Sequence, residues 1–230
     1  MSTRWHVAAD AADWLERALA YVAGAEAEAL AARGAFHIVL AGGGTPETVY
    51  KALAEQDHDW PRWRVWYGDE RCRPPEHDAR NSRLAERAWL NRVALPRTNL
   101  CPMPAELGAQ AGAEAYARQL AGVGPFDLVL LGLGEDGHTA SLFPGHDWGE
   151  GADAGDVLAV FGAPKPPPER VTLSARRLSE ARRVLFLVSG AGKRDAVAAW
   201  RAGGNIPAAA IRPAAGVDVL IDQSAFGEPS

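Results

Sequence analysis

Hydrophobic residues along the chain form short continuous runs that alternate with longer stretches of helical periodicity. Continuous apolar runs bounded by glycine, proline or acidic residues predict buried strands. These runs are FHIVLA (36–41), WRVWYG (63–68), FDLVLL (126–131), VLFLVSG (184–190) and VDVLID (217–222), and VLAVFG (157–162) is strand-like as well. A proline-rich turn, KPPPER (165–170), separates VLAVFG from RVTLS (170–174).

Between these runs, apolar residues recur at the spacing of one helix face. Trp14, Ala18 and Val22 predict a helix over 10–33, which Gly34 can end. Pro46 suits the first position of the next helix, over 47–56. Further helices are expected over 84–90, 108–121 and 192–203.

Strands that are apolar along their whole length and alternate with helices are typical of a parallel sheet covered on both faces. The sequence therefore predicts a Rossmann-like α/β fold, a mainly parallel sheet with helices on both faces, as a single domain over residues 1–230. In such folds ligands bind outside the carboxyl ends of the strands. Four strand ends carry polar or glycine-rich loops that can converge there: GGGTP (42–46), DER (69–71), GEDGH (134–138) and SGAGK (189–193).

Composition narrows the classes of function. The chain has 230 residues, of which 47% are hydrophobic and 23% charged, as in an ordinary globular protein. Its formal net charge of −5, with lysine and arginine scattered, gives no support to binding of nucleic acid or an anionic membrane. There is no apolar run of membrane-spanning length and no signal-peptide pattern, and Cys72 and Cys101 are too few for a disulfide scaffold. We therefore expect a cytoplasmic protein.

Two of the glycine-rich segments allow a phosphate-binding interpretation. In GGGTP, backbone amides at a helix start favour an anion, although the glycines can equally serve a tight turn. Gly132, Gly134 and Gly137 match the dinucleotide fingerprint in spacing, but the fingerprint should open a helix and here it runs into HTASLFPG. SGAGKR lacks the first glycine and the Ser or Thr of a P-loop, which leaves Lys193 to meet a single phosphate or to lie in solvent.

Other chemistries have weaker patterns. His138, His146, Asp136 and Asp147 supply ligand types for a metal, but they lack the spacing of a known ligand pair. No G-x-S-x-G motif surrounds a serine, as a serine hydrolase of the α/β class requires. We therefore expect neither a metal nor a cofactor.

His138 is the strongest candidate for acid–base chemistry. It lies between glycines at a strand end, two residues after Asp136, and a carboxylate that close can orient the imidazole and raise its basicity. A lone histidine is also often structural. Asp69 and Arg71 of the DER segment add charge at a neighbouring strand end, or form a surface cluster of ion pairs.

Five segments together resemble the 6-phosphogluconolactonase family, whose relatives are the glucosamine-6-phosphate deaminases and isomerases. They follow in order along nearly the whole chain: LAGGGTPETVY, WYGDERCRPPEHDARNS, FDLVLLGLGEDGHTASLFPG, KPPPERVTLS and SGAGKR. The resemblance implies hydrolysis of 6-phospho-D-glucono-1,5-lactone in the pentose phosphate pathway. The deaminase branch has a pattern like DGHIAFNEPG, whose glutamate helps to open the sugar ring, and Phe143 stands at that position here. An apolar side chain cannot transfer a proton, so the lactonase branch fits better.

The resemblance also implies roles for particular residues. His138 would be the general base that activates water, and Asp136 would orient it. The amides of Gly43, Gly44 and Thr45, with Arg71 and Lys193, would hold the 6-phosphate; Gly44 stands where a serine is common. Asp69, Lys165 and Arg170 complete the expected substrate-binding set.

Some alternatives stay open in the sequence. The enzyme alternative is an isomerase or deaminase of a hexosamine phosphate, and a non-catalytic sugar-phosphate sensor is the alternative from another class. The expected partner is a small sugar-phosphate lactone, and the chain is a monomer or a small homo-oligomer.

Overall fold

A six-stranded parallel sheet forms the centre of the protein, for which a computed structural model describes residues 2–227. The strand order is β1-β9-β8-β5-β2-β3, and every neighbouring pair is parallel. This confirms the Rossmann-like class expected from the apolar runs. The strands are β1 (Thr3–Ala8), β2 (Phe36–Leu40), β3 (Trp63–Tyr67), β5 (Leu128–Gly132), β8 (Arg183–Val188) and β9 (Val217–Asp222).

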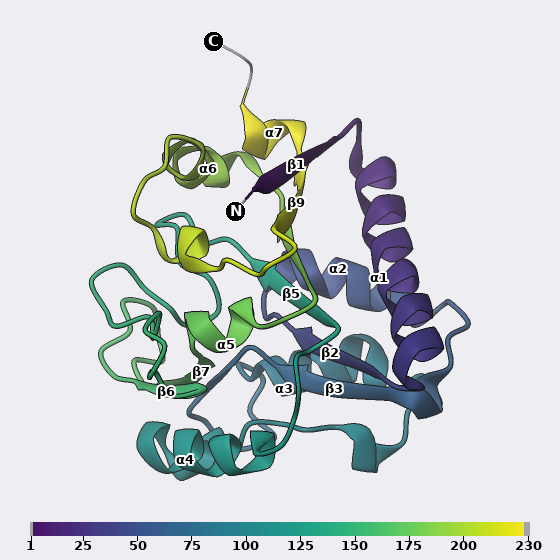
Figure 1. Ribbon diagram of the computed structural model, residues 1–230, viewed down its shortest axis with the longest axis vertical. Helices are drawn as coiled ribbons and strands as arrows, with labels where there is room; N and C mark the ends of the chain where they lie inside the picture. The colour runs from purple at the N-terminus through teal and green to yellow at the C-terminus, as the bar shows by residue number, and fades with distance from the viewer. Residues whose placement is uncertain (1, 228–230) are drawn as a thin grey trace.

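Helices cover both faces of this sheet. The chain moves from β1 to β2 and β3 in one direction and from β8 to β9 in the other, so right-handed crossovers place their helices on opposite faces. Figure 1 shows α1 (Ala11–Arg33) on the right of the sheet and α6 (Arg194–Arg201) on the left. The remaining helices are α2 (Gly44–Leu53), α3 (Asn81–Ala85), α4 (Ala109–Leu120), α5 (Ala175–Ser179) and α7 (Gln223–Phe226).

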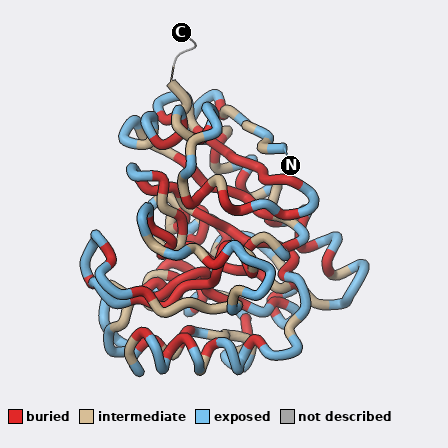
Figure 2. Tube along the Cα trace, turned by 60° about the vertical axis from the view of Figure 1, so that its left-hand side comes forward, coloured by how far each residue is buried: buried red, intermediate tan, exposed pale blue. Residues whose placement is uncertain are grey.

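The strands are buried because both of their faces are covered. Leu128–Leu131 of β5 and Val184–Val188 of β8 are buried without interruption, and Figure 2 shows such buried stretches running through the middle of the molecule. This is the physical origin of the continuous apolar runs in the sequence. No helix within residues 2–227 is both long and apolar enough to cross a membrane.

One part of the chain departs from the parallel alternation. β6 (Val157–Val160) and β7 (Arg170–Leu173) pair antiparallel with each other, and β7 pairs antiparallel with β4 (Asp69–Arg71). They form a separate three-stranded sheet of order β4-β7-β6. The DER segment, expected as a loop, is thus a strand that leaves the main sheet directly after β3. Short apolar runs do not reveal the direction in which they pair, so the antiparallel pairing of these strands was not predicted.

Three local differences concern the borders of elements. β1 was not expected, because its residues alternate between partly buried and exposed at the edge of the sheet. α2 begins at Gly44 with Gly43 as N-cap, so Pro46 is its third residue and the Gly44 and Thr45 amides belong to its first turn. The helix expected over 84–90 begins at Asn81 and becomes π-helical over Glu86–Leu90.

The strand order fixes where a ligand can bind. From β2 the chain goes outward to β3 and then returns to β5, on the other side of β2. Chain connections therefore diverge between β2 and β5, and the crevice at their carboxyl ends is the usual ligand site of an open α/β sheet. The loops that follow these two strands are GGGTP and GEDGH.

Candidate active site

A cavity of about 350 Å³ lies at this divergence of the sheet. The four segments named from the sequence line it, together with the proline-rich loop before β7. Four positively charged side chains and one carboxylate, Asp69, face it; the cations are Arg71, Lys165, Arg170 and Lys193. An excess of positive charge in a concave site favours an anionic ligand.

The first glycine loop brings a helix N-terminus to the cavity wall. Gly43 has φ 103°, a conformation that favours glycine, and its carbonyl accepts the first helical bond from the Glu47 amide at 3.1 Å. The amides of Gly44 and Thr45 precede that bond and have no partner within the helix. Because the helix dipole is positive at this end, the loop suits a phosphate group.

The second glycine loop places the His138 imidazole in the cavity. Nδ1 of His138 lies 2.5 Å from Oδ1 of Asp136, and the His138 amide donates to the same oxygen at 3.2 Å. Only glycine fits at position 134, since a Cβ there would lie 1.9 Å from Nδ1 of His138. The Gly134 amide also donates to the His138 carbonyl at 2.7 Å, which closes the loop. When Nδ1 carries a proton toward Asp136, Nε2 is left with a free lone pair.

Burial sets the charge of this pair. The His138 side chain is 18% exposed, and burial lowers its pKa although the hydrogen bond and charge of Asp136 act to raise it. Burial also raises the pKa of Asp136, but the hydrogen bond and charge of His138 outweigh that effect and hold it below its usual value. A neutral imidazole beside an ionised carboxylate is the state in which His138 can accept a proton near neutral pH.

An aromatic ring packs against the imidazole of His138. Phe143 is fully buried, and its ring centroid lies 4.8 Å from that of His138. The Arg170 guanidinium lies 5.4 Å from the same ring. Ala140 lies between His138 and Phe143 in the sequence. Its φ of 48° is uncommon for a residue with a side chain and often marks functional loops. The space next to the His138 ring is thus filled by Phe143, whose side chain has no proton to transfer.

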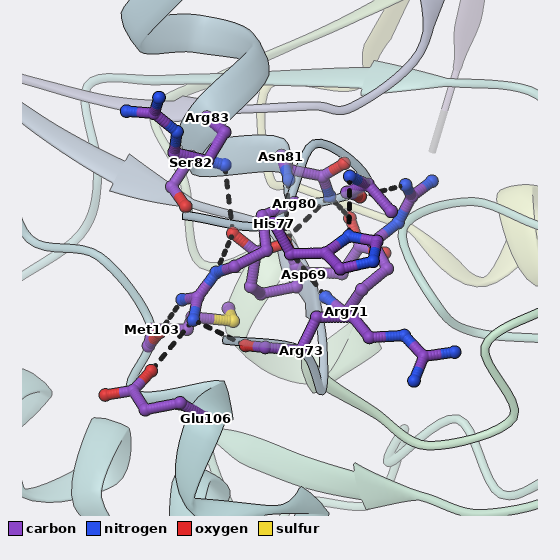
Figure 3. A network of polar contacts seen from close by, with 12 residues as sticks. Asp69, Arg71, Arg73, His77, Arg80, Asn81, Ser82, Arg83, Met103 and Glu106 are labelled. Atoms are coloured by element: carbon purple, nitrogen blue, oxygen red, sulfur yellow. Dashed lines mark hydrogen bonds and ion pairs between the residues drawn. The ribbon is translucent and has the colours of Figure 1, made fainter. Parts of the chain in front are cut away.

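The DER strand is part of a buried polar network instead of a surface cluster of ion pairs. Asp69 is 5% exposed and accepts from Nδ2 of Asn81 at 2.9 Å and from Oγ of Ser141 at 2.5 Å. Glu70 is fully buried and forms an ion pair with Arg80 at 3.3 Å. Figure 3 shows Asp69, Arg71, Arg80 and Asn81 in this network. Arg71 reaches the cavity wall while its Nη1 donates to the Ala79 carbonyl at 2.5 Å.

The loop that carries Lys193 is held by a carboxylate from the neighbouring strand. Oδ2 of Asp222, the last residue of β9, accepts from Oγ of Ser189 at 2.6 Å and from the Gly190 amide at 2.9 Å. Gly190 has φ 96°, which turns the chain toward the short helix before α6. The partly exposed Lys193 side chain then lines the cavity.

Arg170 mainly holds the proline-rich loop in place. Its guanidinium donates to the carbonyls of Lys165, Pro166 and Pro167 at 2.9 to 3.2 Å, and it is 4% exposed. Its Nη1 lies 4.0 Å from Asp69. Most of the hydrogen-bonding capacity that the sequence assigned to substrate is therefore used within the protein. Lys165, in contrast, is exposed and lines the cavity.

The structure brings together the site residues expected from the sequence. All of them line the cavity except Asp136, which contacts His138 from outside it. Sequence reasoning did not single out Asn81, Ser141 or Asp222, which contact these residues. Asn81 and Ser141 lie in two of the segments that carry the family resemblance, DARNS (78–82) and HTAS (138–141), and this was the only signal for them in the sequence. No such signal pointed to Asp222.

The alternative ligand set for a metal is not assembled. His146 and Asp147 line a different depression, beside α4 and β6, away from His138 and Asp136. Within residues 2–227, no group of three His, Cys, Asp or Glu side chains could hold a metal ion. The dinucleotide fingerprint fails as well, since no helix follows Gly137 before residue 150.

Comparison with known proteins points to one family. The family model described as "Glucosamine-6-phosphate isomerases/6-phosphogluconolactonase" matches residues 9–220. The chain is 40% identical to a 6-phosphogluconolactonase of Synechocystis, over 92% of each sequence. It is also 40% identical to a 6-phosphogluconolactonase of Mycobacterium tuberculosis, over 81% of this chain and 82% of that protein.

Solved structures agree with these relatives. The 6-phosphogluconolactonase of Thermotoga maritima superposes with a TM-score of 0.88 at 28% identity, covering 96% of this chain and all of that one. The 6-phosphogluconolactonase of Trypanosoma brucei superposes with a TM-score of 0.86 at 29% identity, covering 97% of each chain.

Proposed function

The chain belongs to the glucosamine-6-phosphate isomerase/6-phosphogluconolactonase family, and we propose that it hydrolyses 6-phospho-D-glucono-1,5-lactone to 6-phospho-D-gluconate. One observation carries the proposal. A partly buried imidazole, oriented by Asp136 through Nδ1, lies in the same cavity as a helix N-terminus and four cations. A proton acceptor and an anion site in one cavity match a substrate that has a reactive carbonyl at one end and a phosphate at the other.

The proposed reaction begins with water held by His138. Nε2 accepts a proton from the water as its oxygen attacks C1, and the carbonyl becomes a tetrahedral oxyanion. The bond from C1 to the ring oxygen then breaks, and the imidazolium returns the proton to that leaving oxygen. The product is the open-chain acid. Arg71 and the loop amides are the competing donors for the oxyanion.

Binding of the phosphate end is assigned to separate segments of the chain at one edge of the sheet. The amides of Gly43, Gly44 and Thr45 offer hydrogen bonds at the start of α2, and Arg71 and Lys193 supply charge. Lys165 lies on the proline-rich loop before β7 and also lines the cavity.

The test is direct. Freshly prepared lactone is mixed with the protein, and formation of 6-phosphogluconate is followed after subtraction of the spontaneous rate. We expect a rate proportional to protein concentration, unchanged by exhaustive chelation, because a lactone carbonyl is reactive without a metal. Absence of acceleration, or loss of the rate on chelation with recovery on adding zinc or magnesium, contradicts the proposed reaction.

The other activity in the family's name is tested in parallel. Phe143 is buried against His138, where an acidic side chain would be needed to open a sugar ring. We therefore expect no release of ammonia from glucosamine-6-phosphate. Ammonia release as fast as lactone hydrolysis would overturn the choice of reaction.

A further inference from the structure

We propose that Asn81 is a substrate-binding residue whose side-chain oxygen accepts a hydrogen bond from a hydroxyl group on the lactone ring. The inference rests on the proposed function, because it assumes that the substrate is a polyhydroxylated lactone. It adds to the site a neutral acceptor whose role is to distinguish one pattern of hydroxyl groups from another.

The orientation of the Asn81 amide is fixed by its partners. Its Nδ2 atom donates to the backbone carbonyl of Asp69 and to Oδ1 of Asp69, each at 2.9 Å. A backbone carbonyl can only accept a hydrogen bond, so the nitrogen must face Asp69 and the oxygen must face away from it. Figure 3 shows the nitrogen of Asn81 directed to Asp69 and the oxygen on its other side.

The amide oxygen is directed toward Gly42. A Cβ on Gly42 would lie only 2.0 Å from Oδ1 of Asn81, so the absent side chain leaves the room that this oxygen occupies. Both residues line the cavity, and no donor among residues 2–227 forms a hydrogen bond with Oδ1. An acceptor that is left free in a site otherwise dominated by cationic donors fits a ligand hydroxyl.

The backbone that carries Asn81 is anchored by a buried charge. Asn81 is the first residue of α3, and its amide donates to Oε1 of Glu70 at 2.7 Å. Oε2 of Glu70 accepts from the Ser82 amide at 2.9 Å, and Arg80 lies 3.3 Å from the same oxygen. Asn81 itself is only 4% exposed. A side chain held this firmly loses little entropy when it binds, which favours its use in recognition.

The test removes the two partners of the hydrogen bond separately and together. The wild-type protein and Asn81→Ala are assayed on the parent phosphorylated lactone and on three analogues that lack the hydroxyl at C2, C3 or C4. In the wild type, we expect the loss of one particular hydroxyl to lower kcat/KM about three- to tenfold, the range of a neutral hydrogen bond. In Asn81→Ala, the same deletion should change kcat/KM less than twofold, while the other two deletions have the same effect as in the wild type.

Comparing substrates on one protein separates recognition from folding, because a partly unfolded variant loses activity equally on every substrate. If Asn81→Ala yields no folded protein, Asn81→Ser retains a hydroxyl that can donate to Asp69 but lacks the amide oxygen, and the same result is expected. Asn99→Ala is the matched control, since that amide donates to the Pro61 carbonyl outside the cavity. It should leave all four ratios unchanged.

The outcomes distinguish this inference from the proposed function. A wild-type protein that does not accelerate hydrolysis of the parent lactone contradicts the proposed function, and the assignment of Asn81 then falls with it. An active wild type whose three deletion effects are all unchanged in Asn81→Ala and Asn81→Ser contradicts the assignment of Asn81 alone.

Discussion

Nδ1 of His138 and Oδ1 of Asp136 lie 2.5 Å apart, two residues from each other in one loop. Because this contact uses Nδ1, only Nε2 can accept a proton from water. The contact is local in sequence, but it requires Gly134 to have no side chain and Gly137 to adopt φ 83°. The loop therefore fixes both the direction and the tautomer of the imidazole before a substrate arrives.

Replacing His138 with Asn should remove the base while keeping a side chain of similar size. We expect kcat to fall roughly 10²- to 10⁴-fold, the usual contribution of general base catalysis. KM for the phosphorylated lactone should change little, because the proposed phosphate contacts are made by other segments of the chain. The measurement is the rate of 6-phosphogluconate formation after subtraction of spontaneous hydrolysis. A folded variant with most of the wild-type rate would show that His138 is not the base.

The pH dependence should follow the charge of His138. Its protonated form cannot accept a proton, so the rate should fall as the pH drops through the pKa of the imidazole. Burial lowers that pKa, which places the fall below 6.5, the ordinary value for histidine. The sequence alone suggests a value near 6.5, so the lower position is a consequence of the fold.

Asp136→Asn tests this interpretation with a shift of predictable sign. The carboxylate raises the pKa of His138 against the effect of burial, so its removal should move the acidic limb of the rate profile to still lower pH. The plateau rate should fall about tenfold to a hundredfold, the range of a hydrogen bond to a charged group, because an amide replaces the carboxylate that orients the imidazole. An acidic limb that moves to higher pH would rule out the proposed charge state of the pair.

The geometry of the His138 loop could be predicted from sequence because its interactions are short-range. GEDGH contains the proposed base, the carboxylate beside it and both glycines, and it follows a continuous apolar run. The same holds for α1, where Asp10 caps the helix and Gly34 ends it in the left-handed conformation. Local sequence preferences and tertiary structure agree in these segments.

The supporting contacts could not be predicted, because they join residues far apart in the chain. Ser141 reaches Asp69, and Asp222 reaches Ser189, only after strands from different parts of the sequence have paired. The second sheet was missed for the same reason, since β4 and β7 are separated by about a hundred residues of chain. Arg170 shows the consequence for function: its charge suggests a ligand contact, but the fold uses it to hold a loop.

Lys193→Ala should weaken binding of the phosphate. We expect kcat/KM for the phosphorylated lactone to fall. The fall should correspond to a loss of about 1–3 kcal/mol in transition-state stabilisation, the range of a hydrogen bond to a charged group. The loss should be much smaller for unphosphorylated gluconolactone. Arg194→Ala is the control, because that neighbouring cation donates to the Ser224 carbonyl outside the cavity. Equal losses on both lactones would remove Lys193 from the phosphate site.

Glu70→Ala should destabilise the whole protein, because Glu70 compensates a buried charge. Arg80 is 2% exposed and depends on two carboxylates, Glu70 at 3.3 Å and Glu106 at 2.8 Å. Glu70 is fully buried and also accepts the amides of Asn81 and Ser82. Removing one partner of a buried ion pair costs about 3–5 kcal/mol, so the free energy of unfolding in urea should fall by that amount.

Glu106→Ala is the matched comparison for this last prediction, because its carboxylate contacts the same arginine from a side chain that is 36% exposed. Water can replace an exposed partner, so the expected loss is about 0–1 kcal/mol. The shorter distance belongs to Glu106, and distance alone would therefore predict the reverse order. If Glu106→Ala proves the more destabilising of the two, burial of Glu70 is not what holds Arg80 and the start of α3 in place.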